Sequence, residues 1–287
     1  MVEDRSILSR SFDAANNLFL IGLSLTAFLP FVYVVLHSFS GSVNTLIPTS
    51  FTTAGYRFIF GTPVFLRSMM VSLYITVFGT AISLTLTSLM AYGMSYRHLK
   101  GRRAIFTMVI ITMLFNGGMI PTYFVVRSLG LLNKLWALML PSAISAFYLI
   151  VMKNFFQNIP DELKDSAKID GAHELVVLFR IVIPLSLPAM AAFGLFYAVG
   201  IWNQYFSAVL YIRDSAKWPV QVLLRQIVIL ATGRLEDSSI EYDPTVGNIS
   251  QAMKMAVIIV STLPIIMLYP FLQKHFAKGA LVGSVKG

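Results

Sequence analysis

The chain has 287 residues, of which 56% are hydrophobic and only 12% are charged. Soluble domains carry about 25% charged residues, so this composition and a mean hydropathy of +0.74 place the chain in a lipid bilayer. No cysteine is present, which excludes disulfides and thiolate metal sites, and the four histidines are far apart in sequence, so no metal site is expected. The net charge of +9 comes from basic residues clustered at the edges of apolar segments, as topology signals are, and not from a nucleic-acid surface.

Six apolar segments are long enough to be predicted as transmembrane helices. A helix needs about 20 residues to cross a hydrocarbon core of about 30 Å, and an open chain inside the bilayer satisfies its backbone amides only as a helix. We predict helices at residues 17–39, 68–95, 104–126, 135–156, 185–211 and 252–272. The sequence therefore predicts an all-α polytopic membrane protein whose six-helix domain, 17–272, lies between a polar segment at 1–16 and a tail at 273–287.

The Lys and Arg residues predict that both termini lie in the cytoplasm. Basic residues in short cytoplasmic loops set the orientation of a membrane protein. The short loop RHLKGRR at 97–103 is the clearest marker of this kind. The first residues are polar and mixed in charge, and no short apolar core with a small-residue cleavage site follows, so a cleaved signal peptide is not expected.

The connection between the fifth and sixth predicted helices, 212–251, is expected to lie outside the cytoplasm. Its run VQVLLRQIVI predicts a short amphipathic helix at the membrane interface or over a partner. A solvated linker is the alternative.

A polar segment with an apolar second half separates the fourth and fifth predicted helices. Pro160 suits the first position of a helix, and Asp161 and Glu162 complement the positive end of its dipole. Gly171 permits a backbone conformation closed to other residues, and a second short helix from about 172 to 183 is expected to end at Pro184. Its apolar ridge comprises Leu175, Val176, Leu178, Phe179 and Val182. We expect two short helices that meet at an angle and dock a partner; a plain turn between two spans is the alternative.

This segment resembles the EAA loop of ABC-importer permeases, whose pattern is E-A-A-x-x-D-G-A, eight residues, then I-x-L-P. Asp165-Ser166-Ala167 stands in place of E-A-A, Asp170-Gly171-Ala172 matches fully, and Ile181, Ile183 and Pro184 fall at the expected distances. The departures are Asp for Glu at 165 and Ile for Leu at 183. The six-span layout, the tail FLQKHFAKGALVGSVKG, FNGGMIPTYF at 115–124 and VGIWNQYFSAVLY at 199–211 are similar to maltose-permease-like carbohydrate importers, and among these to alginate-oligosaccharide importer subunits.

The resemblance implies the type I ABC importer permease fold in a bacterial inner membrane. It implies that residues 160–183 form coupling helices that dock an ATP-binding subunit through Asp165, Ala167, Asp170, Gly171, Ala172, Leu175 and Phe179. The expected partners are a second homologous permease subunit, two ATP-binding subunits, an extracytoplasmic solute-binding protein and an oligosaccharide substrate. Because the chain has no G-x-x-x-x-G-K-[ST] phosphate loop, it is not expected to be an enzyme, and ATP and Mg would bind the partner ATPase, with no cofactor on this chain.

The candidate substrate-path residues lie in the third and fifth predicted helices. Polar groups within a span tend to face the bundle interior or a cavity. Positions 197, 201, 204, 205 and 208 share one helical face, and Asn116 and Tyr123 share another; Gly117, Gly118 and Pro121 between them are expected to distort that helix or to permit close packing. The candidates are Asn116, Tyr123, Tyr197, Trp202, Asn203, Gln204 and Tyr205. Helix packing is the alternative role, and Tyr211 is expected to be an interface anchor.

Three other functions compete with an oligosaccharide importer. An ion-coupled carrier usually places a charged group within the membrane, but the central parts of the predicted spans contain no Asp, Glu, Lys or Arg. An intramembrane enzyme would need convergent catalytic groups, which the spans do not offer. The same architecture with a non-sugar solute stays open, because the EAA-like segment concerns energy coupling and not cargo. For an anionic sugar, the available outside cations are Arg127, Lys134 and Arg213; ending helices is the alternative role of these residues.

Overall fold

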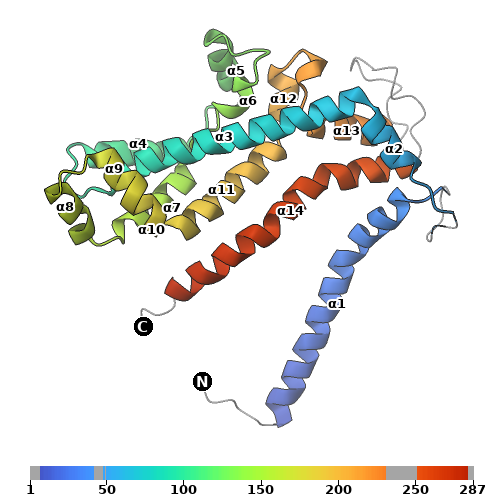
Figure 1. Ribbon diagram of the computed structural model, residues 1–287, viewed down its shortest axis with the longest axis horizontal. Coiled ribbons are helices and arrows are strands. Elements are labelled where there is room, and N and C mark those ends of the chain that lie inside the picture. Colours follow the sequence, from blue (N-terminus) through green and yellow to red (C-terminus); the bar gives the residue numbers. More distant parts are fainter. Residues whose placement is uncertain (1–6, 42–47, 49, 231–250, 284–287) are drawn as a thin grey trace. The chain divides into compact units, whose positions relative to one another are not determined.

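The computed structural model describes residues 7–41, 48, 50–230 and 251–283 (Figure 1). Within these residues the chain is helical, and extended segments pair only in an isolated antiparallel bridge between Ser40 and Phe51. The helices are α1 (Ile7–Ser38), α2 (Ala54–Gly61), α3 (Pro63–Ser95), α4 (Arg102–Leu114), α5 (Met119–Ser128), α6 (Trp136–Met139), α7 (Ala146–Gln157), α8 (Asp161–Ile169), α9 (Glu174–Val177), the π-helical η1 (Leu178–Val182), α10 (Ile183–Leu185), α11 (Leu187–Trp202), α12 (Phe206–Tyr211), the 3₁₀-helical η2 (Ser215–Lys217), α13 (Val220–Leu230) and α14 (Gln251–Gly283). The predicted all-α class is confirmed.

The chain divides into two compact units. Unit 1 comprises Met1–Pro63 and Leu224–Thr262, and unit 2 comprises Val64–Leu223 and Leu263–Gly287. The predicted docking segment and every candidate substrate-path residue belong to unit 2.

Unit 1 contains an apolar helix whose side chains are exposed. The stretch Ser11–Ser38 of α1 is long and apolar enough to cross a membrane, and none of its most apolar window is buried in the protein, which is typical of a helix surrounded by lipid. At its C-terminal end the Ser38 Oγ lies 2.7 Å from the hydroxyl of Tyr56 in α2. The helix α2 lies between the first and second predicted helices, 17–39 and 68–95. Its Gly55 permits close packing, because a Cβ there would lie 2.9 Å from the carbonyl oxygen of Ala252 in α14.

The helix α3 runs along unit 2 and presents small residues to its neighbours (Figure 1). The buried small residues follow helical spacing at Ser68, Ser72, Thr76, Gly79, Ser83 and Thr87. A Cβ at Gly79 would lie 2.9 Å from the Cδ1 of Ile201 in α11 and 3.3 Å from the Cγ of Met139 in α6. Small side chains therefore let these helices approach α3 closely, as in other membrane helix bundles.

Three of the predicted membrane helices are interrupted. The segment 104–126 forms α4 and α5, which meet at 119°, so the distortion expected from Gly117, Gly118 and Pro121 is confirmed; Gly118 has a φ of 86°. The segment 135–156 forms α6 and α7, and the segment 185–211 forms α11 and α12. For the segments 135–156 and 185–211, the prediction of an uninterrupted helix was wrong, because apolar composition alone does not locate breaks in the backbone.

The number of membrane crossings stays a prediction. In the described part of the chain, two helices are long and apolar enough to cross a membrane, Ser11–Ser38 and Pro63–Ser95, and up to four if each of two bent pairs forms one span. The amphipathic segment of the predicted outer loop forms α13, as expected, whereas residues 231–250 of that loop lie outside the described residues. The helix α14 continues to Gly283, so the predicted tail is helical where it is described.

Candidate functional site

The docking element, which we define as residues 160–185, lies at one end of unit 2 and contains α8, α9, η1 and α10 (Figure 1). Pro160 is the N-cap of α8, one residue before the predicted position, and Asp161 and Glu162 fill the first turn as expected. Gly171 has a φ of 82°, the conformation predicted for it. Its amide donates to the carbonyl of Lys168 at 3.0 Å, and the amide of Ala172 donates to the carbonyl of Ala167 at 2.9 Å. These two bonds form a Schellman motif that ends α8.

The second half of the docking element differs from the expected single helix. A four-residue α9 begins at Glu174, and the π-helical η1 follows it directly. Pro184 does not end this helix, because α10 continues through it to Leu185 and the break comes at Ser186. A π-helical turn is one of the adjustments that lets a helix continue past a residue without an N–H group.

The predicted apolar ridge divides into an exposed and a buried set. Leu175 and Phe179 are 49% and 52% exposed, and Val176 is also exposed, whereas Leu178 and Val182 are fully buried in the core of unit 2. The two buried residues therefore stabilise the element and are not available to a partner. On α8, Ile169 is 86% exposed, an apolar contact candidate that the sequence did not single out.

The polar members of the predicted docking set lie on the same element. Asp165, Asp170 and Gly171 are exposed, and Ala167 and Ala172 are half-buried against the core. The element thus offers a mixed surface of carboxylates and apolar side chains around one turn.

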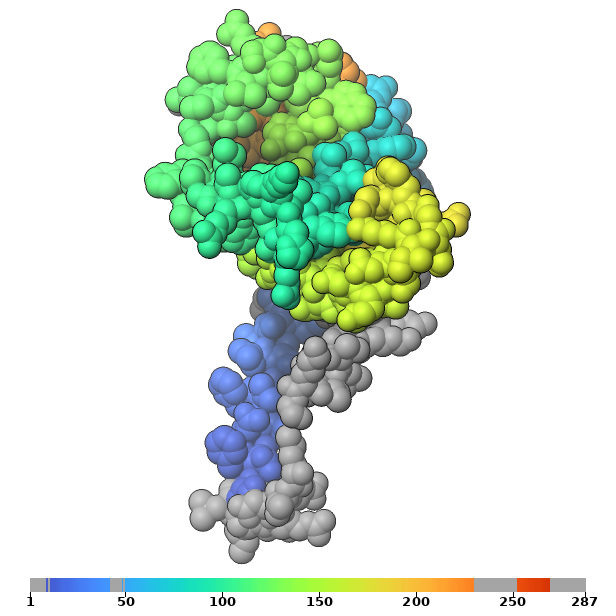
Figure 2. All heavy atoms as spheres, turned by 90° about the vertical axis from the view of Figure 1, so that its left-hand side faces the viewer, coloured from blue at the N-terminus to red at the C-terminus, as the bar shows by residue number. Residues whose placement is uncertain are grey.

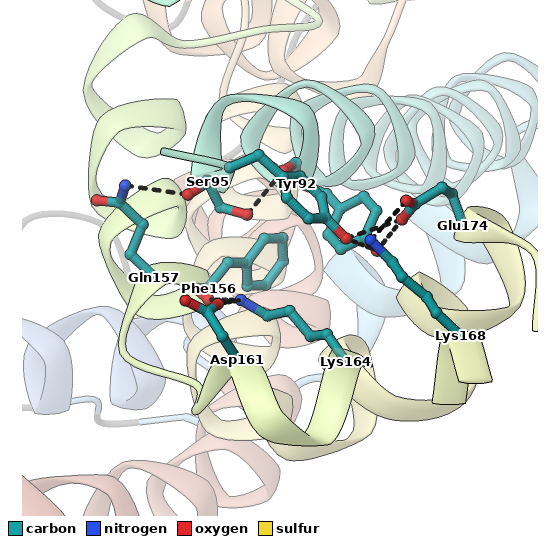
Figure 3. Close-up of polar contacts among 9 residues, drawn as sticks. Tyr92, Ser95, Phe156, Gln157, Asp161, Lys164, Lys168 and Glu174 are labelled. Carbon is teal, nitrogen blue, oxygen red and sulfur yellow. Dashed lines mark hydrogen bonds and ion pairs between the residues drawn. The ribbon is translucent and has the colours of Figure 1, made fainter. Parts of the chain in front are cut away.

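Glu174 joins the docking element to α3, as Figure 3 shows. Its carboxylate accepts hydrogen bonds from the hydroxyls of Tyr92 at 2.6 Å and Tyr96 at 2.8 Å, and it pairs with Lys168 at 2.8 Å. The ammonium of Lys168 also lies 4.5 Å from the centre of the Tyr96 ring. Because Lys168 lies in the last turn of α8 and Glu174 begins α9, the ion pair spans the turn at Gly171 and fixes the two helices relative to each other. We call these four residues the brace.

The brace also sets the charge of its own members. Burial alone would raise the pKa of the Glu174 carboxyl, but hydrogen bonds from Lys168, Tyr92 and Tyr96 lower that pKa to about 2. The hydrogen bond to Glu174 raises the pKa of Lys168 above its usual value, against the opposite effect of burial. Both groups are therefore charged at neutral pH.

A second set of contacts attaches α8 to the helices before it (Figure 3). Lys164 is only 3% exposed, and its Nζ donates to the carbonyl of Phe156 at 3.3 Å and to Asp161 at 3.0 Å. The side chain of Gln157 donates to the carbonyl of Ser95 at 3.1 Å and so connects α7 with the end of α3. Sequence reasoning missed these roles; the i, i+4 spacing of Tyr92 and Tyr96 at the end of a predicted span was the available signal for the brace.

The candidate path residues of the fifth predicted helix are split by a break at 203–205. The face expected to join 197, 201, 204, 205 and 208 is therefore not continuous, because α11 ends at Trp202 and α12 begins at Phe206. Asn203 is exposed at the end of α11, and its Oδ1 lies 3.4 Å from the side-chain nitrogen of Gln221. The Nε2 of Gln204 is buried and has no hydrogen-bond partner among the described residues. Tyr205 is half-buried.

The aromatic candidates of α11 lie inside the helix packing. Trp202 and Tyr197 are buried. The hydroxyl of Tyr197 lies 2.8 Å from the Oγ1 of Thr87 and accepts from the amide of Ser145 at 3.1 Å. These contacts support the packing role for Tyr197.

The candidates near the third predicted helix do not share one helical face, because the break separates them. Asn116 lies between α4 and α5, where its Oδ1 accepts a hydrogen bond from the amide of Gly118 at 2.9 Å. Tyr123 lies in α5, and its ring stacks on Tyr211 with the centroids 6.3 Å apart. Tyr211 is buried in the core, so it is not an exposed interface anchor.

Comparison with known proteins identifies the family. The family model described as binding-protein-dependent transport system inner membrane component matches residues 18–282. The chain belongs to this family. The sequence-based resemblance to carbohydrate-type ABC importer permeases is thereby confirmed, and this inner-membrane component is a transport subunit.

Individual relatives match the inner-membrane component over nearly its whole length. It is 54% identical over 285 residues to the polygalacturonan/rhamnogalacturonan transport system permease protein YtcP of Bacillus subtilis (strain 168), covering 97% of this chain and 99% of the relative. It is 53% identical over 287 residues to protein LplC of the same organism, covering 97% and 96%. A chain in the crystal structure of a bacterial ABC transporter involved in the import of the acidic polysaccharide alginate superimposes with a TM-score of 0.84 at 31% identity, covering 94% of this chain and 98% of that one.

Proposed function

We propose that this chain is one of two permease subunits of an ATP-driven importer of oligosaccharides, and that the docking element couples it to an ATP-binding subunit on the cytoplasmic side. The observation that carries the proposal is the construction of the docking element. It exposes apolar side chains at one end of unit 2 while the brace and Lys164 hold it rigidly against α3 and α7. A rigid element with an exposed apolar surface can transmit the movement of a partner to the membrane helices.

The energetic requirement of such coupling is definite. To invert a two-state population from 1:99 to 99:1, ATP binding must favour one conformation by about 5.5 kcal/mol. That free energy reaches the membrane helices only if the docking element and the helices move together. We propose that the brace provides the rigid contacts that join them. Six membrane crossings with both termini in the cytoplasm complete the proposed arrangement.

The double variant Leu175→Asp/Phe179→Asp tests the docking surface. Each side chain is about half exposed, so its remaining burial by a partner is worth about 1 kcal/mol. We expect at least tenfold less ATPase subunit to co-purify with the variant in mild detergent, measured by quantitative mass spectrometry. The matched control is Leu129→Asp, at an exposed leucine outside the docking element.

Two outcomes would contradict the docking proposal. One is equal recovery of the ATPase with the double variant and with wild type. The other is purification of the wild-type chain alone or as a homo-oligomer, which would favour an ion-coupled secondary carrier.

For the cargo, we propose an oligosaccharide with anionic groups. The support is that one relative is named for polygalacturonan and rhamnogalacturonan transport and that the structural neighbour imports the acidic polysaccharide alginate. Stimulation of ATP hydrolysis in vesicles by a solute-binding protein loaded with acidic oligosaccharides, but not with neutral ones of equal length, is the expected result. Stimulation by a loaded amino-acid, phosphate or polyamine receptor instead would assign the same architecture to a non-sugar solute.

For the substrate path, we propose that the break at 203–205 faces the cargo. Irregular backbone within a membrane domain is tolerated where it lines a cavity or is buried in protein. The buried side-chain amide of Gln204 has N–H groups without an acceptor among the described residues, and these could donate to a hydroxyl of the substrate. We expect Gln204→Leu to raise the KM for uptake several-fold with little change in melting temperature. Tyr197→Phe should instead lower the melting temperature with little change in KM, because it removes a hydroxyl that joins α11 to Thr87 and Ser145. Unchanged uptake by the Gln204 variant would remove the break from the path.

A further inference from the structure

A basic cavity of about 490 Å³ lies between the loop at 97–101, α4 and α7, next to the docking element. This volume is within the range of about 300–1,000 Å³ that is typical of small-molecule sites. Figure 2 shows the face of unit 2 on which the first turn of α4, in teal, and the docking element, in yellow, are both exposed. The lining residues are Arg97, Leu99, Gly101, Arg102, Arg103, Phe106 and Lys153.

The cavity has cationic side chains without acidic partners. Among the described residues, no carboxylate lies within ion-pair distance of Arg97, Arg102, Arg103 or Lys153. Asp161 is the neighbouring carboxyl, and its pKa is lowered first by Lys164, to which it is hydrogen-bonded, and only further by Arg97. The formal charge of the lining is therefore positive and uncompensated.

Lys153 is a buried cation in the lining of the cavity, unlike the arginines at its surface. Its side chain is only 8% exposed, its Nζ donates to the Oδ1 of Asn154 at 2.9 Å, and the same atom lies 5.2 Å from the centre of the Phe106 ring. Burial of a cation without a counter-charge is unfavourable. An anion in the cavity would remove that cost.

The backbone of α4 also favours an anion in the cavity. Gly101, with a φ of 78°, is the N-cap of the 13-residue α4, so the positive end of this helix borders the cavity. The Nε of Arg102 donates to the carbonyl of Met94 at 3.1 Å, which holds that guanidinium in place at the rim.

The surroundings favour a lipid over a free anion. Leu99 and Phe106 give the cavity an apolar wall. Beyond it, α4 exposes Ile105, Met108 and Ile111, along which acyl chains can lie. Basic pockets between membrane helices are known binding sites for anionic headgroups. We propose that this cavity binds the phosphate-bearing headgroup of an anionic phospholipid in the leaflet on the side of the docking element.

The test measures lipid retention by the whole assembly and does not depend on transport. The chain, purified with its co-purifying subunits, is exchanged into nanodiscs of phosphatidylcholine containing a minority of phosphatidylglycerol, and the lipid retained after re-extraction in detergent is quantified by mass spectrometry. We expect enrichment of phosphatidylglycerol in wild type and a several-fold loss of that enrichment in Arg103→Gln, because this variant removes a direct contact of the guanidinium with the headgroup phosphate. Lys153→Met should lower retention at least as much. Because Arg103 is exposed, its variant tests the site even where the Lys153 variant fails to fold.

Lys100→Gln is the matched control, since Lys100 is an exposed cation of the same loop that does not line the cavity. An equal loss of retention in this control would show a diffuse surface charge effect and overturn the proposal. Absence of enrichment in wild type would also overturn it. So would displacement of the lipid by inorganic phosphate at constant ionic strength, which would assign the cavity to a free anion.

Discussion

At the scale of single residues, Glu174 joins three side chains at the docking element. The hydroxyls of Tyr92 in α3 and of Tyr96 just after it, together with the ammonium of Lys168 in α8, converge on one carboxylate. Hydrogen bonds to a charged group contribute more than those between neutral groups, although the half-exposed position of Glu174 reduces their strength through solvent screening. The residue therefore matters more for the geometry of α9 than for the overall stability of the protein.

Replacement of Glu174 by Gln tests this separation. We expect a loss of about 1 kcal/mol in stability, together with a larger loss of transport per ATP hydrolysed, because α9 is no longer fixed to α3. The two quantities can be measured on the same vesicles, as thermal denaturation and as the ratio of uptake to phosphate release. Glu162→Gln is the control, since the carboxylate of Glu162 is exposed in the first turn of α8. An unchanged uptake ratio in the Glu174 variant would mean that the brace is not part of coupling.

The pKa directions in the brace predict its pH range. The pKa of Glu174 falls from 4.5 to about 2, so its contribution to stability is complete above pH 4.5 and is lost as pH falls through 2. The pKa of Lys168 is raised above 10.5, so its contribution is present below that pH and is lost only as pH rises through the raised value. Between pH 5 and pH 9, the Glu174→Gln variant should thus differ from wild type by a constant shift in melting temperature. A shift that disappears within this range would contradict the ionised pair.

At the scale of elements, the turn at Gly171 determines how α8 meets α9. A Cβ at this position would meet nothing within 4 Å, so the requirement for glycine comes from the backbone conformation alone. A non-glycine residue in this conformation costs about 1–2 kcal/mol. A carboxylate side chain, as in Gly171→Asp, would add a charge to the exposed surface of the element.

Gly130 offers a matched comparison for this turn. It also has a positive φ, of 64°, and open space around its Cα, but it lies outside the docking element. We expect Gly171→Ala and Gly130→Ala to lower the melting temperature similarly, whereas only Gly171→Ala uncouples ATP hydrolysis from uptake. Equal transport by the two variants would contradict a special role for the Gly171 turn.

The elements also show what the sequence could and could not predict. The first helix of the docking element and the turn at Gly171 were predictable, because proline, glycine and acidic residues act locally on the backbone. The course of the chain past Pro184 was not, since it depends on the π-helical turn before it. The break near Gly118 was also predictable, because glycines indicate it. The break at 203–205 was not, because none of these three residues is a glycine or a proline.

At the scale of the whole molecule, composition was enough to assign an all-α membrane protein. The contacts of the candidate site were less accessible, because they join residues far apart in sequence, such as Tyr92 with Glu174 or Thr87 with Tyr197. A single sequence contains the identities of such residues but not their pairing. Two of the five residues of the predicted apolar ridge, Leu178 and Val182, belong to the core, and the sequence could not separate them from the exposed ones because an exposed and a buried apolar residue look alike in a sequence.

The exposed apolar side chains of the docking element have a further consequence for the living cell. Ile169, Leu175 and Phe179 remain in contact with water until a partner covers them, and apolar surface of this kind promotes aggregation when it is left uncovered. Under the proposed docking, excess copies of the chain would present to chaperones and proteases the surface that the complete assembly hides. The docking proposal therefore predicts that a cell must synthesise the subunits in balanced amounts.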